Sequence, residues 1–214
     1  VTASRTAPLA LPLVDSRPNA ILTREPGGAP VAEDIRRLLV EGEPDCGSAE
    51  TELSLFTAAR RDHLEKTIRP ARERGITVIS DRFADSTRVY QGATRGDLRS
   101  KVDALHSLMI EREPDLTILI DMDPKTALQR GLARSSGEDR FEDMGLEFQQ
   151  ALRTGFLDLA ENDTASRRAI DGHRSSENVR SSGQDAIPDP AQVADIPAPD
   201  PEDTAPTHDS TDTT

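Results

Sequence analysis

Short apolar runs alternate with longer stretches of helical periodicity along most of the chain. The runs are residues 20–23 (AILT), 77–80 (TVIS), 116–121 (LTILID) and a weaker one at 169–171 (AID). Continuous apolar strands that alternate with helices are typical of a parallel sheet covered on both faces. The pattern therefore predicts an α/β fold in which ligands bind beyond the carboxyl ends of the strands.

Apolar residues at helical spacing predict helices between and after these strands. The expected helices span residues 30–40, 48–69, 98–112 and 144–159, and a further one begins at Pro124. Ser48 and Asp123 are suited to cap the helices that follow them, because their side chains can accept hydrogen bonds from free backbone amides. Pro70 is expected to end or kink the second helix, because it has no amide hydrogen.

The apolar content is uneven along the chain and divides it into three regions. Only 35% of the 214 residues are hydrophobic, and from Gln184 to the end there are eight acidic residues and no lysine or arginine. Such a segment buries too little apolar surface to offset the entropy of ordering. We expect an N-terminal segment at 1–19, a globular domain at 20–173 and an acidic disordered tail at 174–214.

The charge and the cysteine content argue against several classes of protein. The formal net charge is −13, and eight of the negative charges lie from Gln184 to the end, which argues against a nucleic-acid-binding surface. The single cysteine, Cys46, cannot form an intramolecular disulfide, which fits a reducing cytosol. No apolar run approaches the ~20 residues of a membrane span. We expect a cytoplasmic protein with no nucleic-acid or membrane partner.

Charged residues follow two of the expected strands. Arg24 and two glycines follow the first strand (REPGG, 24–28), and Asp81 and Arg82 follow the second. The glycines permit a tight turn near a ligand, an arginine suits a phosphate, and a strand-end carboxylate can hold Mg²⁺ through water. Taken singly, each feature also fits an ordinary strand-to-helix turn or a capped strand end, which is the commoner case.

Two pairs of side chains share a helix face, because their members are four residues apart. Phe56 and Arg60 suit stacking on a base and bonding its carbonyl group, but they also suit a core contact beside a surface arginine. Arg130 and Arg134 suit closure over phosphates, and equally a solvated basic helix end. The histidines have no metal-ligand spacing, and His63 is expected at the surface or in helix packing.

Five motifs in a fixed order combine these signals. They are TREPGG (23–28), LFTAAR (55–60), DRFADSTRVYQG (81–92), PDLTILIDMDP (114–124) and EDRFE (138–142). Together they resemble the thymidylate kinase family over residues 21–161. The resemblance implies a P-loop kinase-like parallel sheet flanked by helices. It also implies transfer of the γ-phosphoryl group of ATP to dTMP, with Mg²⁺, to form dTDP for dTTP synthesis.

The resemblance implies roles for individual residues. Phe56 would stack on thymine, Arg60 would bond the edge of the base, and Tyr90 would lie against the sugar. Asp81 would support Mg²⁺ through water. The other residues implied to hold the nucleotide or its phosphate are Glu25, Arg36, Arg82, Ser86, Thr87 and Gln91.

The resemblance also implies a lid and a quaternary structure. Arg130, Arg134 and Arg140 would belong to a mobile lid, from which one arginine reaches the ATP phosphates. The expected catalytic residues are Asp81, Arg82 and Arg140. Members of the family typically dimerise through helices, so a homodimer is implied by analogy.

One part of the family pattern is missing from the 214 residues. They contain no G-x-x-x-x-G-K-[ST], the loop whose amides and lysine hold phosphates in such kinases. By family spacing the loop should end near Val1, so we interpret segment 1–19 as degenerate and expect the first, central strand to be missing. Turnover is then expected to be severely reduced. A non-catalytic dTMP-binding remnant, an interaction protein and a truncated reading frame remain open as alternatives.

Overall fold

The structure is a computed structural model that describes residues 19–40, 47–93, 98–132 and 144–187. Its strands are β1 (Ala20–Arg24), β2 (Thr77–Asp81), β3 (Thr117–Asp121) and β4 (Arg167–Asp171). β1 pairs with β2 and β3 pairs with β4, both in parallel. All four predicted strands are confirmed.

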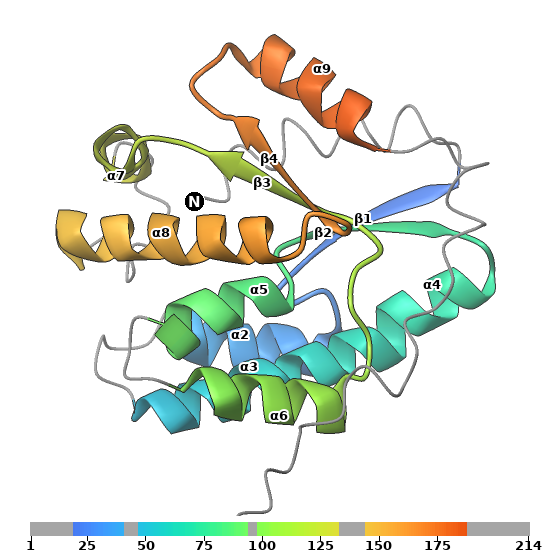
Figure 1. Ribbon diagram of the computed structural model, residues 1–214. Helices are drawn as coiled ribbons and strands as arrows, with labels where there is room; N and C mark the ends of the chain where they lie inside the picture. Colours follow the sequence, from blue (N-terminus) through green and yellow to red (C-terminus); the bar gives the residue numbers. More distant parts are fainter. Residues whose placement is uncertain (1–18, 41–46, 94–97, 133–143, 188–214) are drawn as a thin grey trace, which may run out of the picture.

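The helices lie on both sides of the strands. They are α2 (Pro30–Val40), α3 (Ala49–His63), α4 (Arg69–Glu73), α5 (Ala84–Thr87), α6 (Arg99–Met109), α7 (Pro124–Leu132), α8 (Gly145–Asn162) and α9 (Ser176–Ala186), with π-helical turns η1 (Leu64–Ile68) and η2 (Arg88–Ala93). In Figure 1, α9 lies on one side of β3 and β4 and α8 lies on the other, while α2, α3 and α6 lie together at the end away from α9. The predicted α/β class is confirmed.

The two strand pairs form separate sheets in the described part of the chain. β2 and β3 are not hydrogen-bonded to each other, yet Ile79 of β2 packs against the cluster that contains Ile120 of β3. A parallel sheet without its central strand would have this arrangement, with one unpaired edge on each side of the gap. Residues 1–18, which form most of the N-terminal segment interpreted as degenerate, lie outside the described residues, so the expectation of a missing first strand stays a prediction.

Two helix starts follow from local hydrogen bonding. Ser48 Oγ accepts a hydrogen bond from the Thr51 amide at 3.2 Å, and Asp123 Oδ2 accepts one from the Thr126 amide at 2.9 Å. Each bond satisfies an amide that the helix itself cannot pair. Both predicted caps are confirmed, and α2 has the predicted bounds.

Three predicted helix ends are wrong, and one of them is that of α8, which was predicted to end at residue 159 but continues to Asn162. Helix α3 runs through η1 directly into α4, and Pro70 lies in the first turn of α4, where the missing amide hydrogen is tolerated. The helix predicted to reach residue 112 ends at Met109. Glu111 has φ 58°, a left-handed conformation that a right-handed helix cannot contain.

The expected tail begins too early at residue 174, because α9 occupies its first part. Ser175 Oγ accepts a hydrogen bond from the Asn178 amide at 3.3 Å, and buried Val179 packs with Ile120. A cap and one well-placed apolar contact thus order a segment of low apolar content. Residues 188–214 lie outside the described residues.

The segment that follows β2, which consists of α5 and η2, packs against α3, α6 and α8. Val89 and Tyr90 form a buried cluster with Leu152 and Leu159 of α8, and burial of a leucine side chain contributes about 2 kcal/mol. Within the described ranges, every helix is too short or too polar to span a bilayer.

Candidate functional site

The segments that follow β1 and β2 lie side by side. Arg24 and Asp81 are register partners at the carboxyl ends of the two strands, and the Glu25 amide donates to the Asp81 carbonyl at 2.9 Å. Parallel pairing therefore brings together the REPGG and DRFADST motifs, which are 57 residues apart by first residue numbers 24 and 81. The two motifs lie at the carboxyl ends of these strands, where the sequence predicts that ligands bind.

A buried ion pair links the first motif to α3. Arg60 and Glu25 are each 4% exposed, and Arg60 Nε donates to Glu25 Oε2 at 2.7 Å. A buried pair of this kind carries a large desolvation cost, but loss of one partner leaves an uncompensated charge. The position of the Arg60 guanidinium is therefore set by a carboxylate from another element.

Arg60 also reaches the second motif. Its Nη2 atom donates to Thr87 Oγ1 at 2.9 Å, and its guanidinium carbon lies 5.3 Å from the centre of the Phe83 ring. Arg60 thus contacts residues from both strand-end motifs. Glu25 has its two oxygens on Arg60 and His63, so the structure gives it a supporting position; its predicted contact with a ligand stays a prediction.

His63 completes this buried chain of polar groups. Its ring is fully buried, with Nδ1 3.0 Å from Glu25 Oε1 and Nε2 2.7 Å from Thr23 Oγ1. Of the two positions expected for His63, at the surface or in helix packing, the structure shows the second. The spacing of three residues from Arg60 places both side chains on one face of α3, and this is the signal by which sequence reasoning could have found it.

The glycines of REPGG allow the loop to lie against this chain. Gly28 has φ +81°, and a Cβ atom there would lie 2.5 Å from both His63 Nε2 and Thr23 Oγ1. Close approach was predicted for these glycines, but here the neighbour is a protein side chain. The Gly28 amide also donates to Glu33 at 2.9 Å, and that hydrogen bond is the main cause of a lowered pKa for the Glu33 carboxyl.

Arg82 and Tyr90 lie together at the start of the segment after β2. Arg82 has φ +73°, and its guanidinium carbon lies 5.3 Å from the centre of the Tyr90 ring. A left-handed arginine costs about 1–3 kcal/mol and is commonest at functional sites. Tyr90 is buried with its ring edge-to-face against Phe148 and Phe156, so α8 determines where this predicted sugar contact lies.

The buried face of α5 and η2 carries two more of the predicted residues. Thr87 and Gln91 are each 1% exposed, and Gln91 Nε2 lies 3.5 Å from Glu52 Oε2 on α3. A π-helical turn is rare and often occurs at functional sites, because it changes the direction of side chains within a helix. Ser86 is half-buried, and its amide donates to the Phe83 carbonyl.

The remaining predicted residues fall into two groups. Phe56 is half-buried on α3, one turn before Arg60, and Arg36 of α2 donates to the Pro26 carbonyl at 2.7 Å. The predicted lid residues are Arg130, Arg134 and Arg140, and the structure does not describe their side chains. Arg130 is on α7, while Arg134 and Arg140 are outside the described residues.

A second cluster of charges lies at the carboxyl ends of β3 and β4, and sequence reasoning missed it. Arg153 of α8 donates two hydrogen bonds to Asp121, at 2.7 and 2.8 Å, and they are the main cause of a lowered pKa for that carboxyl. His173 pairs with Asp171 at 3.0 Å. Among the described residues, no group of three acidic, histidine or cysteine side chains could hold a metal ion by itself.

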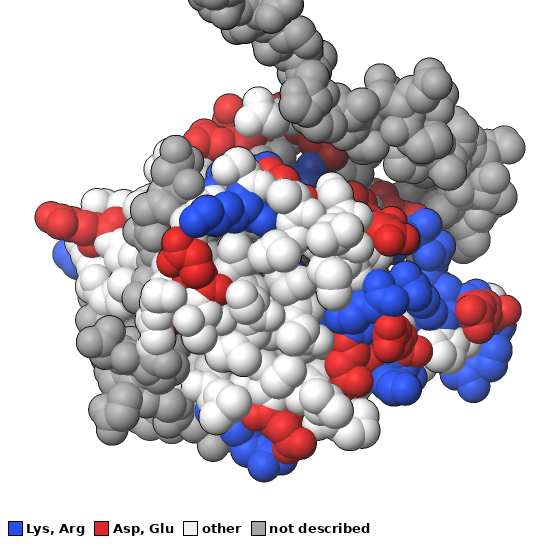
Figure 2. Space-filling model, turned by 90° about the horizontal axis from the view of Figure 1, so that it is seen from below, with Lys and Arg blue, Asp and Glu red and all other residues white. Residues whose placement is uncertain are grey.

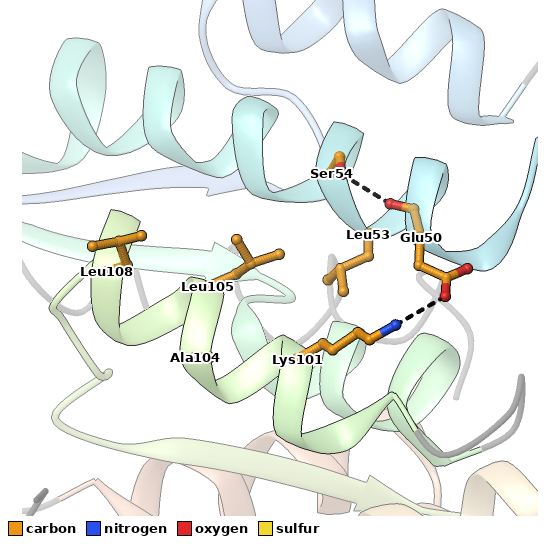
Figure 3. A pocket seen from close by; sticks show the side chains of 7 residues that line it. All are labelled: Glu50, Leu53, Ser54, Lys101, Ala104, Leu105 and Leu108. Carbon is orange, nitrogen blue, oxygen red and sulfur yellow. Dashed lines mark hydrogen bonds and ion pairs between the residues drawn. The ribbon is translucent and has the colours of Figure 1, made fainter.

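A hollow of about 340 Å³ lies apart from both clusters, between α3 and α6. Figure 3 shows Leu53, Leu105 and Leu108 along it, with the ion pair of Glu50 and Lys101 at one end. The lining is mainly apolar, its polar side chains are Glu50, Ser54 and Lys101, and Lys101 is already paired with Glu50. This hollow is therefore unsuited to a nucleotide.

The fold and the first cluster define an α/β enzyme class that binds a nucleotide beyond parallel strands. Residues 12–182 match the family model described as thymidylate kinase. The chain is 68% identical over 171 residues to the thymidylate kinase of Dinoroseobacter shibae, covering 80% of this chain and 83% of that protein. It is 63% identical over 161 residues to that of Ruegeria pomeroyi, covering 75% and 76%.

A solved structure agrees with these similarities. The crystal structure of thymidylate kinase from Ehrlichia chaffeensis is 32% identical, with a TM-score of 0.66 over 85% of this chain and 89% of that chain. The chain therefore belongs to the thymidylate kinase family, which consists of nucleoside monophosphate kinases that use ATP as phosphate donor.

Proposed function

We propose that the cluster around Arg60 is the dTMP site of a thymidylate kinase. The observation that carries the proposal is the buried Arg60 guanidinium, which contacts Glu25 and Thr87 and so joins three motifs at one strand edge. In this site Phe56 stacks on thymine and Arg60 bonds the base edge. Tyr90 faces the sugar. The dTMP phosphate and the rest of the nucleotide are held by Arg36, Arg82, Ser86, Thr87 and Gln91.

The reaction that fits this site is phosphoryl transfer from ATP to dTMP. A phosphate oxygen of dTMP forms the new bond to the γ-phosphorus, while the bond from that phosphorus to the β-γ bridging oxygen breaks and ADP leaves. The attacking oxygen is already ionised at neutral pH, so no strong base is required. Catalysis then consists of positioning and charge stabilisation, in which Arg82 and the lid residues Arg130, Arg134 and Arg140 are the proposed cations.

Asp81 fits a role in holding Mg²⁺ through water. It is a half-buried carboxylate at the carboxyl end of β2, next to Arg82. Magnesium in phosphoryl transfer is bound by one or two carboxylates together with substrate phosphates and water. A single carboxylate is consistent with such a site, and the ion would neutralise charge on the phosphates. A cytoplasmic location, where ATP and dTMP are available, belongs to the same proposal.

The phosphate-donor side is where the 214 residues differ from the family pattern, because they contain no G-x-x-x-x-G-K-[ST]. A coupled assay for dTDP, together with calorimetric titration by dTMP, tests the proposal. We expect dTMP binding that is lost in Arg60→Ala, and very low turnover. A chimera that places a strand and a G-x-x-x-x-G-K-[ST] loop before residue 19 should recover turnover.

The two measurements separate the possible failures. Absence of dTMP binding in the wild type and in the chimera contradicts the proposed site. Turnover by the 214 residues equal to that of the Dinoroseobacter shibae relative contradicts the need for the loop. Binding without turnover in the chimera contradicts the proposed catalysis while it leaves the proposed dTMP site intact.

We also propose a homodimer formed through α2, α3 and α6. Leu38 of α2 and Leu108 of α6 are 60% and 70% exposed, and Leu108 lines the apolar hollow between α3 and α6. Figure 2 shows this side of the molecule, where uncharged residues cover most of the central surface. Sedimentation should show a dimer for wild type and a monomer for Leu108→Glu. Leu146→Glu, at an exposed leucine of α8, is the control that should remain dimeric.

A further inference from the structure

Arg88 is a buried charge in the segment after β2 that consists of α5 and η2. The proposed function assigns no role to Arg88. Its side chain is 7% exposed, and it forms ion pairs with Asp85, Asp103 and Glu113. Its Nε donates to Asp103 of α6 at 2.9 Å, its Nη1 donates to Asp85 of α5 at 2.9 Å, and both terminal nitrogens bond Glu113. One guanidinium therefore joins three carboxylates from three parts of the chain.

A second layer of ion pairs extends this connection to β4. Arg167 donates to both oxygens of Asp85, at 2.9 and 3.0 Å, and it also pairs with Asp163. Arg99 pairs with Asp103 on the exposed side of α6. Asp85 thus has an arginine on each side, and α5 is held to α6, to the segment before β3 and to β4.

The arginines of this network favour the ionised forms of two of its carboxylates, Asp85 and Glu113. Burial raises the pKa of Asp85, but the hydrogen bonds and charges of Arg167 and Arg88 outweigh it and hold that pKa below its usual value. Burial likewise raises the pKa of Glu113, yet His106 and Arg88 lower it to about 2. Ionised carboxylates around one arginine define its position more strictly than an apolar contact does.

The network lies directly behind residues of the proposed dTMP site. Thr87 precedes Arg88 and faces Arg60, while Gln91 lies in the same π-helical turn as Arg88 and faces Glu52. Thr87 and Gln91 are four residues apart and share one side of this segment. The Arg88 guanidinium instead contacts Asp85, Asp103 and Glu113, so it anchors the segment through a different set of partners. Movement of this anchor moves both of these side chains.

We propose that Arg88 is a positioning residue for dTMP, which acts by holding α5 and η2 so that Thr87 and Gln91 face the nucleotide. The inference rests on the proposed function for the identity of the ligand. In this proposal Arg88 affects dTMP binding without contacting the nucleotide. The affinity for dTMP then depends on ion pairs that involve residues of α6 and β4.

The test compares Arg88→Lys and Arg88→Met with the control Arg99→Met, which removes an exposed pair on the same Asp103. Amide hydrogen exchange of residues 84–92 without ligand measures the positioning itself. Titration with dTMP, well below the melting temperature of each variant, measures its consequence. We expect faster exchange in 84–92 and about tenfold weaker dTMP binding for both Arg88 variants, and no change for Arg99→Met.

A double-mutant comparison separates positioning from general destabilisation. If Arg88 acts through Gln91, the effects of Arg88→Lys and Gln91→Ala on dTMP affinity are less than additive, whereas independent effects add. Additive effects, or faster exchange spread evenly over all helices, would overturn the proposal. If the wild type does not bind dTMP, the proposed function fails, and unchanged exchange in residues 84–92 of Arg88→Lys would separately overturn the positioning role.

Discussion

The carboxyl ends of the two strand pairs carry similar charges in opposite surroundings. At β1 and β2, the side chains of Arg60 and Glu25 are 5% and 3% exposed. At β3 and β4, those of Arg153 and Asp121 are 41% and 25% exposed. Both pairs have hydrogen bonds of 2.7 Å. The bond lengths are the same, so the difference between the two ends lies in access of water.

This difference separates a prearranged site from an adaptable one. A buried guanidinium cannot exchange its partners for water, so its direction is set before a ligand binds. Binding then costs little side-chain conformational entropy. An exposed pair loses most of its strength to solvent and can open at small cost. The proposed dTMP side is therefore rigid, while the β3–β4 end is suited to change.

Removal of the buried arginine should have the largest effect. Arg60→Met leaves the Glu25 carboxylate buried with only His63 beside it, and we expect a loss of about 3–5 kcal/mol in the free energy of unfolding. Urea unfolding measures this loss. Arg153→Met is the matched control at the other strand pair, where we expect less than about 1 kcal/mol. Equal losses in the two variants would remove the distinction between the two ends.

The next effect concerns the histidine behind the ion pair. His63→Leu has similar bulk but leaves Glu25 Oε1 and Thr23 Oγ1 without a buried partner, which should cost about 1–3 kcal/mol. Thermal unfolding followed by circular dichroism measures the change. His63→Gln keeps a polar group at this position and should lose less. If His63→Leu is as stable as His63→Gln, the hydrogen bonds of His63 with Glu25 and Thr23 do not contribute to stability.

A smaller effect should separate close packing from backbone strain. Gly28→Ala places a Cβ atom 2.5 Å from His63 Nε2 at φ +81°, while Gly75→Ala has φ +72° with no atom within 4 Å. Strain alone costs about 1 kcal/mol at either position. The extra loss at Gly28, measured by urea unfolding, reports how tightly the loop packs on α3. Identical losses would show that the loop moves away easily.

The smallest effect should be the pH dependence of the exposed end. The pKa of Asp121 is lowered in the folded chain, chiefly by its hydrogen bonds with Arg153. Its stabilising contribution is therefore present above the unfolded pKa, roughly 3.9, and is lost as pH falls through the lower folded value. Asp121→Asn should be less stable than wild type by up to about 1 kcal/mol at pH 7. Unfolding measured from pH 7 to pH 2 should show this difference disappearing.

The amino-acid sequence by itself determined the local elements and the family. The strands, the bounds of α2 and the caps at Ser48 and Asp123 depend on neighbouring residues, so periodicity and cap chemistry were sufficient. The ordered motifs were sufficient for the thymidylate kinase family. The early tail boundary was wrong because mean composition does not show that Val179 meets Ile120.

The tertiary structure decided which charges are buried and what they contact. Glu25 is 35 residues from Arg60 and Arg88 is 25 from Glu113, and nothing local specifies either pair. His63 was expected at the surface or in helix packing, and its place in the polar chain depends on the loop after β1 lying across α3. Burial depends on elements that meet only after folding, and burial decides whether a charge is a replaceable surface group or a fixed part of the site.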